Sequence, residues 1–190
     1  MKCGKPVAEE REYCADCERH VLAFEQGRSL WVHKGIVSKA VYRFKFHNKR
    51  YYAGVFAGEM AHRYETWMEK LGADVMIPVP LHSTKRRSRG FNQAELLAKE
   101  LGKRTGIPVE TEAVVRAKKT RPQKQLGYRE REDNLKGAFG VRGTWRAPET
   151  VLLIDDIYTT GNTVHRIAKV LKKAGVQKVY FLTISIGQGL

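Results

Sequence analysis

The chain has 190 residues, of which 42% are hydrophobic and 29% are charged, and this fits one packed domain with a small appendage better than two full domains. No apolar run approaches the roughly 20 residues that span a bilayer, and residues 1–10 are too polar for a secretory signal, so we expect a cytoplasmic location. The formal net charge of +15 favours polyanionic partners, either nucleic acid or a phosphorylated small molecule, although a merely basic surface has the same charge.

The chain begins with a polar, cysteine-bearing head. All three cysteines lie within the first 17 residues, which indicates a metal more than a disulfide. Cys14 and Cys17 have the C-x-x-C spacing of half a zinc knuckle, and Cys3 precedes a glycine, as a knuckle cysteine often does. A structural Zn²⁺ would take its fourth ligand either from His20, at C-x-x-H spacing, or from a cysteine in a longer N-terminus. The alternative is three free thiols.

The next segment, from Gly35 to Leu71, has a helical pattern. Its apolar residues recur at intervals of three and four. The main stripe is formed by Tyr52, Val55, Phe56, Met60, Tyr64, Trp67 and Met68, and a shorter stripe before it is formed by Val37, Val41 and Phe44. Gly72 is placed to end the segment as a C-cap glycine.

After Gly72 the pattern alternates between strands and helices. We predict strands over residues 75–79, 112–115, 151–154 and 178–186, and helices over residues 91–104 and 163–173. Such alternation is typical of an α/β domain with a mainly parallel sheet.

A basic segment without periodicity occupies residues 116–136. A loop of this length in a compact domain is usually functional or disordered. It could close over a reactive intermediate, or it could lie along a nucleic-acid backbone with an aromatic ring for stacking. Both interpretations stay open. The candidate loop residues are Lys118, Arg121, Gln123, Tyr128, Arg129 and Arg131.

The most informative segment is V-L-L-I-D-D-I-Y-T-T-G-N-T over residues 151–163. Asp155 and Asp156 follow a buried strand, at the edge where ligands bind in open α/β sheets. Hydroxyl residues and Gly161 then lead into a helix, whose N-terminus favours an anion. The acids can accept hydrogen bonds from vicinal hydroxyls or help to hold hydrated Mg²⁺. A ligand with a 5-phosphate, a ribose diol and a metal-bound pyrophosphate would satisfy every group.

Other interpretations of this segment are a structural strand with a capping acid, or a different kind of magnesium site. A P-loop is excluded, because the chain has no G-x-x-x-x-G-K-[ST] run. A second basic run begins where the chain leaves the predicted strand 75–79. Lys85, Arg86, Arg87 and Arg89 could stabilise a pyrophosphate leaving group there, or they could form a solvated turn.

Residues 151–163 resemble the phosphoribosyl pyrophosphate signature of type I phosphoribosyltransferases. Two further motifs narrow the resemblance to the ComF family of competence-associated proteins. One is P-V-P-L-H over residues 78–82, followed by R-G-F-N-Q over residues 89–93. The other is the series Thr120, Gln123, Leu126, Arg129, Asn134 and Phe139. With the cysteine head, the likeness covers nearly the whole chain.

The resemblance implies a type I phosphoribosyltransferase fold over residues 35–190, with a mainly parallel sheet of about five strands flanked by helices, after a small zinc-knuckle-like head over residues 1–34. It also implies that Asp155 and Asp156 bind the ribose hydroxyls and are the catalytic residues. The 5-phosphate loop would be Thr159, Thr160, Gly161, Asn162 and Thr163. The pyrophosphate site would be Pro80, Leu81 and His82, with Lys85, Arg86 and Arg89.

Two main hypotheses of function follow. The first is an enzyme that displaces pyrophosphate from phosphoribosyl pyrophosphate with the help of Mg²⁺, and whose acceptor is an unidentified nitrogenous base. The second is a non-catalytic protein of DNA uptake that binds single-stranded DNA and other competence proteins. A zinc-ribbon nucleic-acid protein with an α/β scaffold is a weaker third. The oligomeric state stays open.

Overall fold

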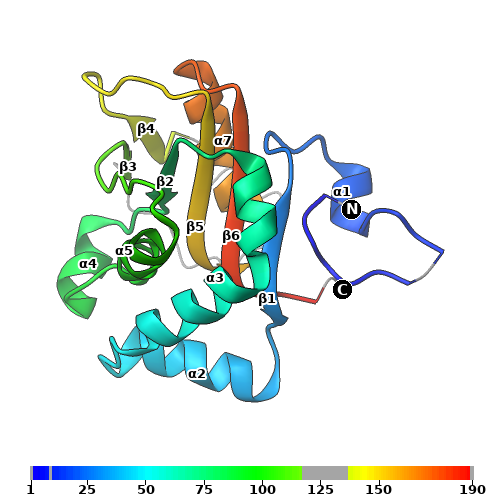
Figure 1. Ribbon diagram of the computed structural model, residues 1–190, viewed down its shortest axis with the longest axis vertical. Helices are drawn as coiled ribbons and strands as arrows, with labels where there is room; N and C mark the ends of the chain where they lie inside the picture. The colour runs from blue at the N-terminus through cyan, green and yellow to red at the C-terminus, as the bar shows by residue number, and fades with distance from the viewer. Residues whose placement is uncertain (1, 9, 117–136, 189–190) are drawn as a thin grey trace.

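The computed structural model describes residues 2–8, 10–116 and 137–188. Its centre is a four-stranded parallel sheet with the order β1–β6–β5–β2 (Figure 1). The strands are β1 (Gly27–Val32), β2 (Val75–Pro78), β5 (Thr150–Tyr158) and β6 (Lys178–Ile186). A separate antiparallel pair consists of β3 (Val114–Arg116) and β4 (Phe139–Val141). The predicted α/β fold with a mainly parallel sheet is confirmed. The six candidate loop residues between Lys118 and Arg131 lie outside the described ranges.

Helices cover both faces of the sheet. Leu152 and Ile154 of β5 face a core formed with α2 (Gly35–Phe46), α3 (Tyr52–Leu71) and α5 (Gln93–Thr105). Val151 and Leu153 face the opposite core, which includes α7 (Asn162–Lys173) and the head with its short helix α1 (Ala15–Arg19). Successive side chains of a strand point to opposite faces. β5 is therefore buried on both sides, as its apolar run predicts.

β1 is a strand that the sequence analysis did not predict. Residues 27–32 were expected in the head, but they pair with β6 from Gly27 opposite Phe181 to Val32 opposite Ile186. A side chain at position 27 would overlap the ring of Phe181, so glycine is required there. We therefore propose that the head ends before Gly27.

The helical segment 35–71 consists of two helices, and each carries one of the two apolar stripes. Helix α2 ends at Phe46, and Asn48 in the connection has a φ of 51°. Gly72 adopts the predicted left-handed C-cap conformation, with a φ of 57°. Val55, which was predicted in the apolar stripe, is 54% exposed. Among the described residues, no helix is long and apolar enough to cross a membrane.

The basic run after β2 is a helix, α4 (Ser83–Arg89), and not a turn. His82 caps its first turn, since its Nδ1 accepts a hydrogen bond from the backbone N–H of Thr84 at 3.3 Å. Gly90 ends it in a left-handed conformation, with a φ of 77°. These caps at both ends support a seven-residue helix that has no apolar stripe and buries none of its residues.

Candidate functional site

The acid pair lies at the edge of the sheet where β2 and β5 end together. The two strands are parallel, and Pro78 lies opposite Ile154. The loop after β2 therefore begins beside Asp155, as the sequence predicts. β5 itself continues to Tyr158, so the acids lie within the strand near its end and not after it. Both carboxylates are partly buried.

Burial and charge make the acid pair electrostatically unusual. One carboxylate oxygen of Asp155 accepts a hydrogen bond from the backbone N–H of Asp156 at 2.8 Å. Burial, and then the charge of Asp156, raise the pKa of Asp155 to about 8. A cation near this carboxyl would lower that pKa, so the chemistry of the pair fits a hydrated divalent metal.

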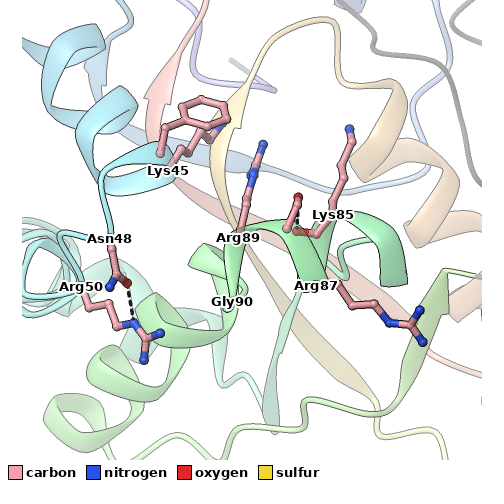
Figure 2. Close-up of a pocket in the computed structure, with 9 residues that line it drawn as sticks. Lys45, Asn48, Arg50, Lys85, Arg87, Arg89 and Gly90 are labelled. Atoms are coloured by element: carbon pink, nitrogen blue, oxygen red, sulfur yellow. Dashed lines mark hydrogen bonds between the residues drawn. The ribbon is translucent and has the colours of Figure 1, made fainter.

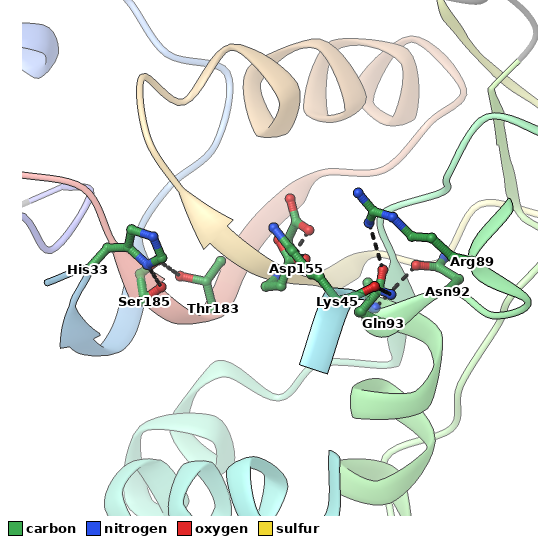
Figure 3. A network of polar contacts seen from close by, with 10 residues as sticks. His33, Lys45, Arg89, Asn92, Gln93, Asp155, Thr183 and Ser185 are labelled. Atoms are coloured by element: carbon green, nitrogen blue, oxygen red, sulfur yellow. Dashed lines mark hydrogen bonds and ion pairs between the residues drawn. The ribbon is translucent and has the colours of Figure 1, made fainter. Parts of the chain in front are cut away.

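Lys45 of α2 is a partner of the acid pair that the sequence analysis missed. Its Nζ lies 2.8 Å from a carboxylate oxygen of Asp156, and both side chains are largely buried (Figure 3). Arg116, the last described residue of β3, was also missed as a site residue. Burial lowers its pKa, whereas the nearby charge of Asp155 raises it. Lys45 had no sequence signal, because it belongs to a helix that only the fold brings to this edge. Arg116 begins the basic segment 116–136, but nothing in the sequence indicated that it lies near Asp155.

Polar side chains of β1 and β6 lie beside the acids (Figure 3). Thr183 pairs in register with Asp155, and its hydroxyl lies 2.6 Å from that of Ser29. The Ser185 hydroxyl lies 2.9 Å from Nδ1 of His33. Thr183 and Ser185 are fully buried in the sheet, so these hydrogen bonds offset the cost of burying their polar groups.

The predicted phosphate loop forms a tight turn into α7. Gly161 has a φ of 80°, and a side chain there would overlap the hydroxyl of Tyr158. Thr159 is exposed and Thr163 is half-buried. In the part of the chain that the structure describes, Thr160 Oγ1 and Asn162 Nδ2 are buried without a hydrogen-bond partner. The first turn of α7 contains no acid. Two orphaned donors at a helix N-terminus fit a phosphate.

The predicted pyrophosphate residues separate into two groups. Pro80, Leu81 and His82 form a half-buried loop after β2, and Lys85 and Arg89 line a cleft. Arg86 does not join them, because its guanidinium pairs with Glu95 at 3.3 Å.

The cleft, which we call the basic cleft, lies between the end of α2, the connection to α3, and α4 (Figure 2). Its volume is about 620 Å³. It is lined by Lys45, Phe46, Asn48, Arg50, Lys85, Arg87, Ser88, Arg89 and Gly90. Lys45 lines the cleft and also contacts Asp156, so it links the cleft to the acid pair.

The three cysteines converge in the head. Their sulfur atoms lie within 4.8 Å of one another, and the sulfurs of Cys3 and Cys14 are 3.4 Å apart. A hydrogen bond from Cys17 lowers the pKa of Cys3 to about 6, although burial opposes this. A thiol that ionises this readily favours a metal ligand. The cluster is compatible with a zinc knuckle; His20, the predicted fourth ligand, is not part of the described cluster.

Comparisons with known proteins identify a domain and several relatives of this chain. A family model described as a phosphoribosyl transferase domain matches residues 87–185. "Competence protein F" of Haemophilus influenzae is 31% identical over 93% of this chain and 80% of that protein. "Competence protein ComFC" of Bacillus subtilis is 28% identical over 91% of this chain and 71% of that protein. "DNA utilization protein YhgH" of Salmonella typhimurium is 29% identical over 94% of this chain and 79% of that protein.

Proposed function

Because the chain belongs to the ComF family of competence-associated proteins and carries a phosphoribosyltransferase domain, we propose that it binds phosphoribosyl pyrophosphate with Mg²⁺ and transfers the phosphoribosyl group to a nitrogenous acceptor. The observation that carries the proposal is that two orphaned donors follow the acid pair along the chain, and that Lys45 links this pair to the lining of the basic cleft. The orphaned polar atom of Thr160 lies just before α7, and that of Asn162 lies at the first residue of this helix. The cations Lys85 and Arg89 extend from α4.

Each group has a role in this proposal. Thr160, Asn162 and the N-terminus of α7 bind the 5-phosphate, whose charge complements the helix dipole. Asp155 and Asp156 accept hydrogen bonds from the ribose hydroxyls. Asp155 would also hold the hydration shell of Mg²⁺, which supplies positive charge to the pyrophosphate when it is bound.

The proposed reaction is a substitution at the anomeric carbon. The lone pair of an acceptor nitrogen forms the new bond to that carbon. The bond to the pyrophosphate oxygen breaks, and its electron pair leaves with the pyrophosphate. The proton of the acceptor nitrogen is released to solvent. Lys85 and Arg89 stabilise the charge that develops on the leaving group, as preorganised cations do in other transfer reactions.

Release of pyrophosphate tests this function. The purified protein is incubated with phosphoribosyl pyrophosphate, Mg²⁺ and a panel of nitrogenous acceptors, and pyrophosphate is measured by an enzyme-coupled assay. We expect acceptor-dependent release that Asp155→Asn reduces at least about a hundredfold. A matched control is Asp74→Asn, because Asp74 lies at the opposite end of β5, where it accepts a hydrogen bond from the backbone of Thr150 at 2.8 Å. Release that no acceptor stimulates would contradict transfer.

A further inference from the structure

The basic cleft carries an excess of positive charge. Five of its lining residues are lysine or arginine, and none is acidic. Lys45 is already neutralised by Asp156. Burial, and then the positive charges of Arg116, Arg89 and Lys45, lower the pKa of Lys85. Cations held this close to one another gain free energy when an anion joins them.

Neutral groups orient the two arginines that flank the cleft. Arg89 donates to the side-chain oxygen of Gln93 at 3.0 Å and lies 4.7 Å from the ring centre of Phe46. Arg50 donates to the side-chain oxygen of Asn48 at 2.9 Å and lies 4.9 Å from the ring centre of Phe91. Within the described chain neither guanidinium pairs with an acid.

These contacts prepare the guanidinium groups for an anion. Amide oxygens and aromatic faces hold each side chain in place but leave its full charge available. The planar fork of arginine then matches the geometry of a phosphate. Figure 2 shows Lys85 and Arg89 extending from α4 in the same direction, whereas Arg87 points away from them.

The cleft is larger than one pyrophosphate needs. Its volume of about 620 Å³ is in the range of sites that hold a whole small molecule. Arg50 and Asn48 come from the connection between α2 and α3, and not from the loop after β2 that is expected to receive pyrophosphate. Phe46, whose ring also contacts Arg89 and Tyr42, is 54% exposed and adds apolar surface. A second ligand therefore has an anion site beside an exposed aromatic side chain.

We propose that the basic cleft binds the phosphate group of the acceptor, so that the acceptor is a phosphorylated nitrogenous compound of nucleotide size and not a free base. The inference rests on the proposed function, because it assumes that phosphoribosyl pyrophosphate occupies the neighbouring acid pair and α7 turn. Arg50 binds the acceptor phosphate, whereas Lys85 and Arg89 keep their proposed role toward the pyrophosphate. Lys45 lines the same cleft and contacts the acid pair.

Calorimetric titration tests this inference. Phosphoribosyl pyrophosphate and Mg²⁺ are titrated first. The four ribonucleoside 5′-monophosphates and the matching nucleosides are then titrated into both the free and the saturated protein. The saturated arm excludes binding of the nucleotide phosphate at α7. Three variants are compared: Arg50→Ala, Arg50→Lys and Lys178→Ala. Arg50→Lys keeps the charge but loses the planar fork. Lys178 is the control, because it begins β6 at the end of the sheet opposite the acid pair.

We expect the saturated protein to bind at least one monophosphate at least about tenfold more tightly than its nucleoside. Arg50→Ala and Arg50→Lys should weaken that binding by about tenfold, which is typical of a lost charged hydrogen bond. Lys178→Ala should not weaken it, and the affinity of Arg50→Lys for phosphoribosyl pyrophosphate should stay within about twofold.

Three results would overturn the inference. The first is equal binding of nucleotides and nucleosides, and the second is unchanged nucleotide binding in both Arg50 variants. The third is a loss of phosphoribosyl pyrophosphate affinity in Arg50→Lys that is as large as its loss of nucleotide affinity. The last result would assign the whole cleft to pyrophosphate. If only phosphoribosyl pyrophosphate failed to bind, the result would instead contradict the proposed function. The titration of nucleotides into the free protein would still test the basic cleft.

Discussion

The Nζ of Lys45 lies 2.8 Å from a carboxylate oxygen of Asp156, and this ion pair joins α2 to the acid pair of β5. The charge of Lys45 also lowers the pKa of Asp155, opposing the effects of burial and of Asp156. The helices after the head therefore do more than cover the sheet. They supply a charge that favours the ionised form of Asp155.

Lys45→Met should shift the pH dependence of ligand binding. Without the ammonium group the pKa of Asp155 rises above its value of about 8. The affinity for phosphoribosyl pyrophosphate with Mg²⁺ should then fall at pH 7, and the midpoint of its acid limb should move to higher pH. Calorimetry between pH 6 and 9 measures both, and Lys45→Arg is the charge-conserving control. A midpoint that does not move in Lys45→Met would show that the ion pair has no such role.

The raised pKa of Asp155 also predicts a pH-dependent cost in stability. The unfolded carboxyl titrates near pH 4 and the folded one near pH 8. Between these values the native state binds more protons than the unfolded state, so this group makes stability fall as pH rises. Asp155→Asn removes the effect. It should raise the melting temperature by at least about 2 °C at pH 8 and by less at pH 5.

Thermal unfolding at the two pH values measures this difference. Asp74→Asn is the control, because the Asp74 carboxylate caps the opposite end of β5, away from the acid pair. Equal changes of melting temperature at pH 5 and pH 8 in Asp155→Asn would be inconsistent with a proton held by Asp155 in the native state.

Gly161 and Tyr158 should be coupled in a double-mutant cycle. Gly161→Ala places a methyl group against the Tyr158 hydroxyl at a left-handed backbone position, and should cost about 1–3 kcal/mol of unfolding free energy. Tyr158→Phe removes a buried hydroxyl that has no described partner, so it should be neutral or stabilising. In the Tyr158→Phe background the cost of Gly161→Ala should be smaller. Urea denaturation of the four proteins measures the coupling, and strictly additive changes would count against it.

Leu153 and Val55 should differ strongly in their contributions to stability. Leu153 is completely buried in a central strand, so Leu153→Ala should cost about 2–5 kcal/mol. Val55 is 54% exposed, so Val55→Ala should change the unfolding free energy by less than about 0.5 kcal/mol. Urea denaturation compares the two variants. A large loss in Val55→Ala would indicate that α3 is covered by another surface in solution.

The cysteine cluster should bind one Zn²⁺ per chain. The convergence of three sulfur atoms within 4.8 Å provides most of a tetrahedral site. Mass spectrometry for metals on purified protein measures the content, and Cys14→Ser should reduce it. A chelator should lower the melting temperature, because the metal cross-links the head. Metal-free protein that keeps its melting temperature when Zn²⁺ is added would contradict a structural site.

The sequence was most informative where local chemistry determines local structure. The apolar run before Asp155, the glycine at position 161 and the C-cap at Gly72 each act within a few residues, so the strand, the turn and the helix end could all be predicted. The common edge of β2 and β5 also followed, because parallel strands in an α/β sheet end on one side.

Features that depend on distant partners could not be predicted in this way. Lys45 resembles any other surface cation until the fold brings it to the acid pair. Arg116 belongs to the basic segment that the sequence indicated, but only the fold shows that it lies near Asp155. β1 escaped prediction because an edge strand needs no long apolar run, and only its pairing with β6 identifies it. Helix α4 has no apolar periodicity, and its stability comes from the caps at His82 and Gly90.

The most direct test of the central claim is calorimetric titration of the protein with phosphoribosyl pyrophosphate in the presence and absence of Mg²⁺, beside an Asp155→Ala/Asp156→Ala variant whose folding is verified by circular dichroism. We predict saturable binding that Mg²⁺ strengthens and that the variant abolishes. The absence of binding to folded protein, or equal binding by the variant, would contradict the account and direct attention to single-stranded DNA and protein partners.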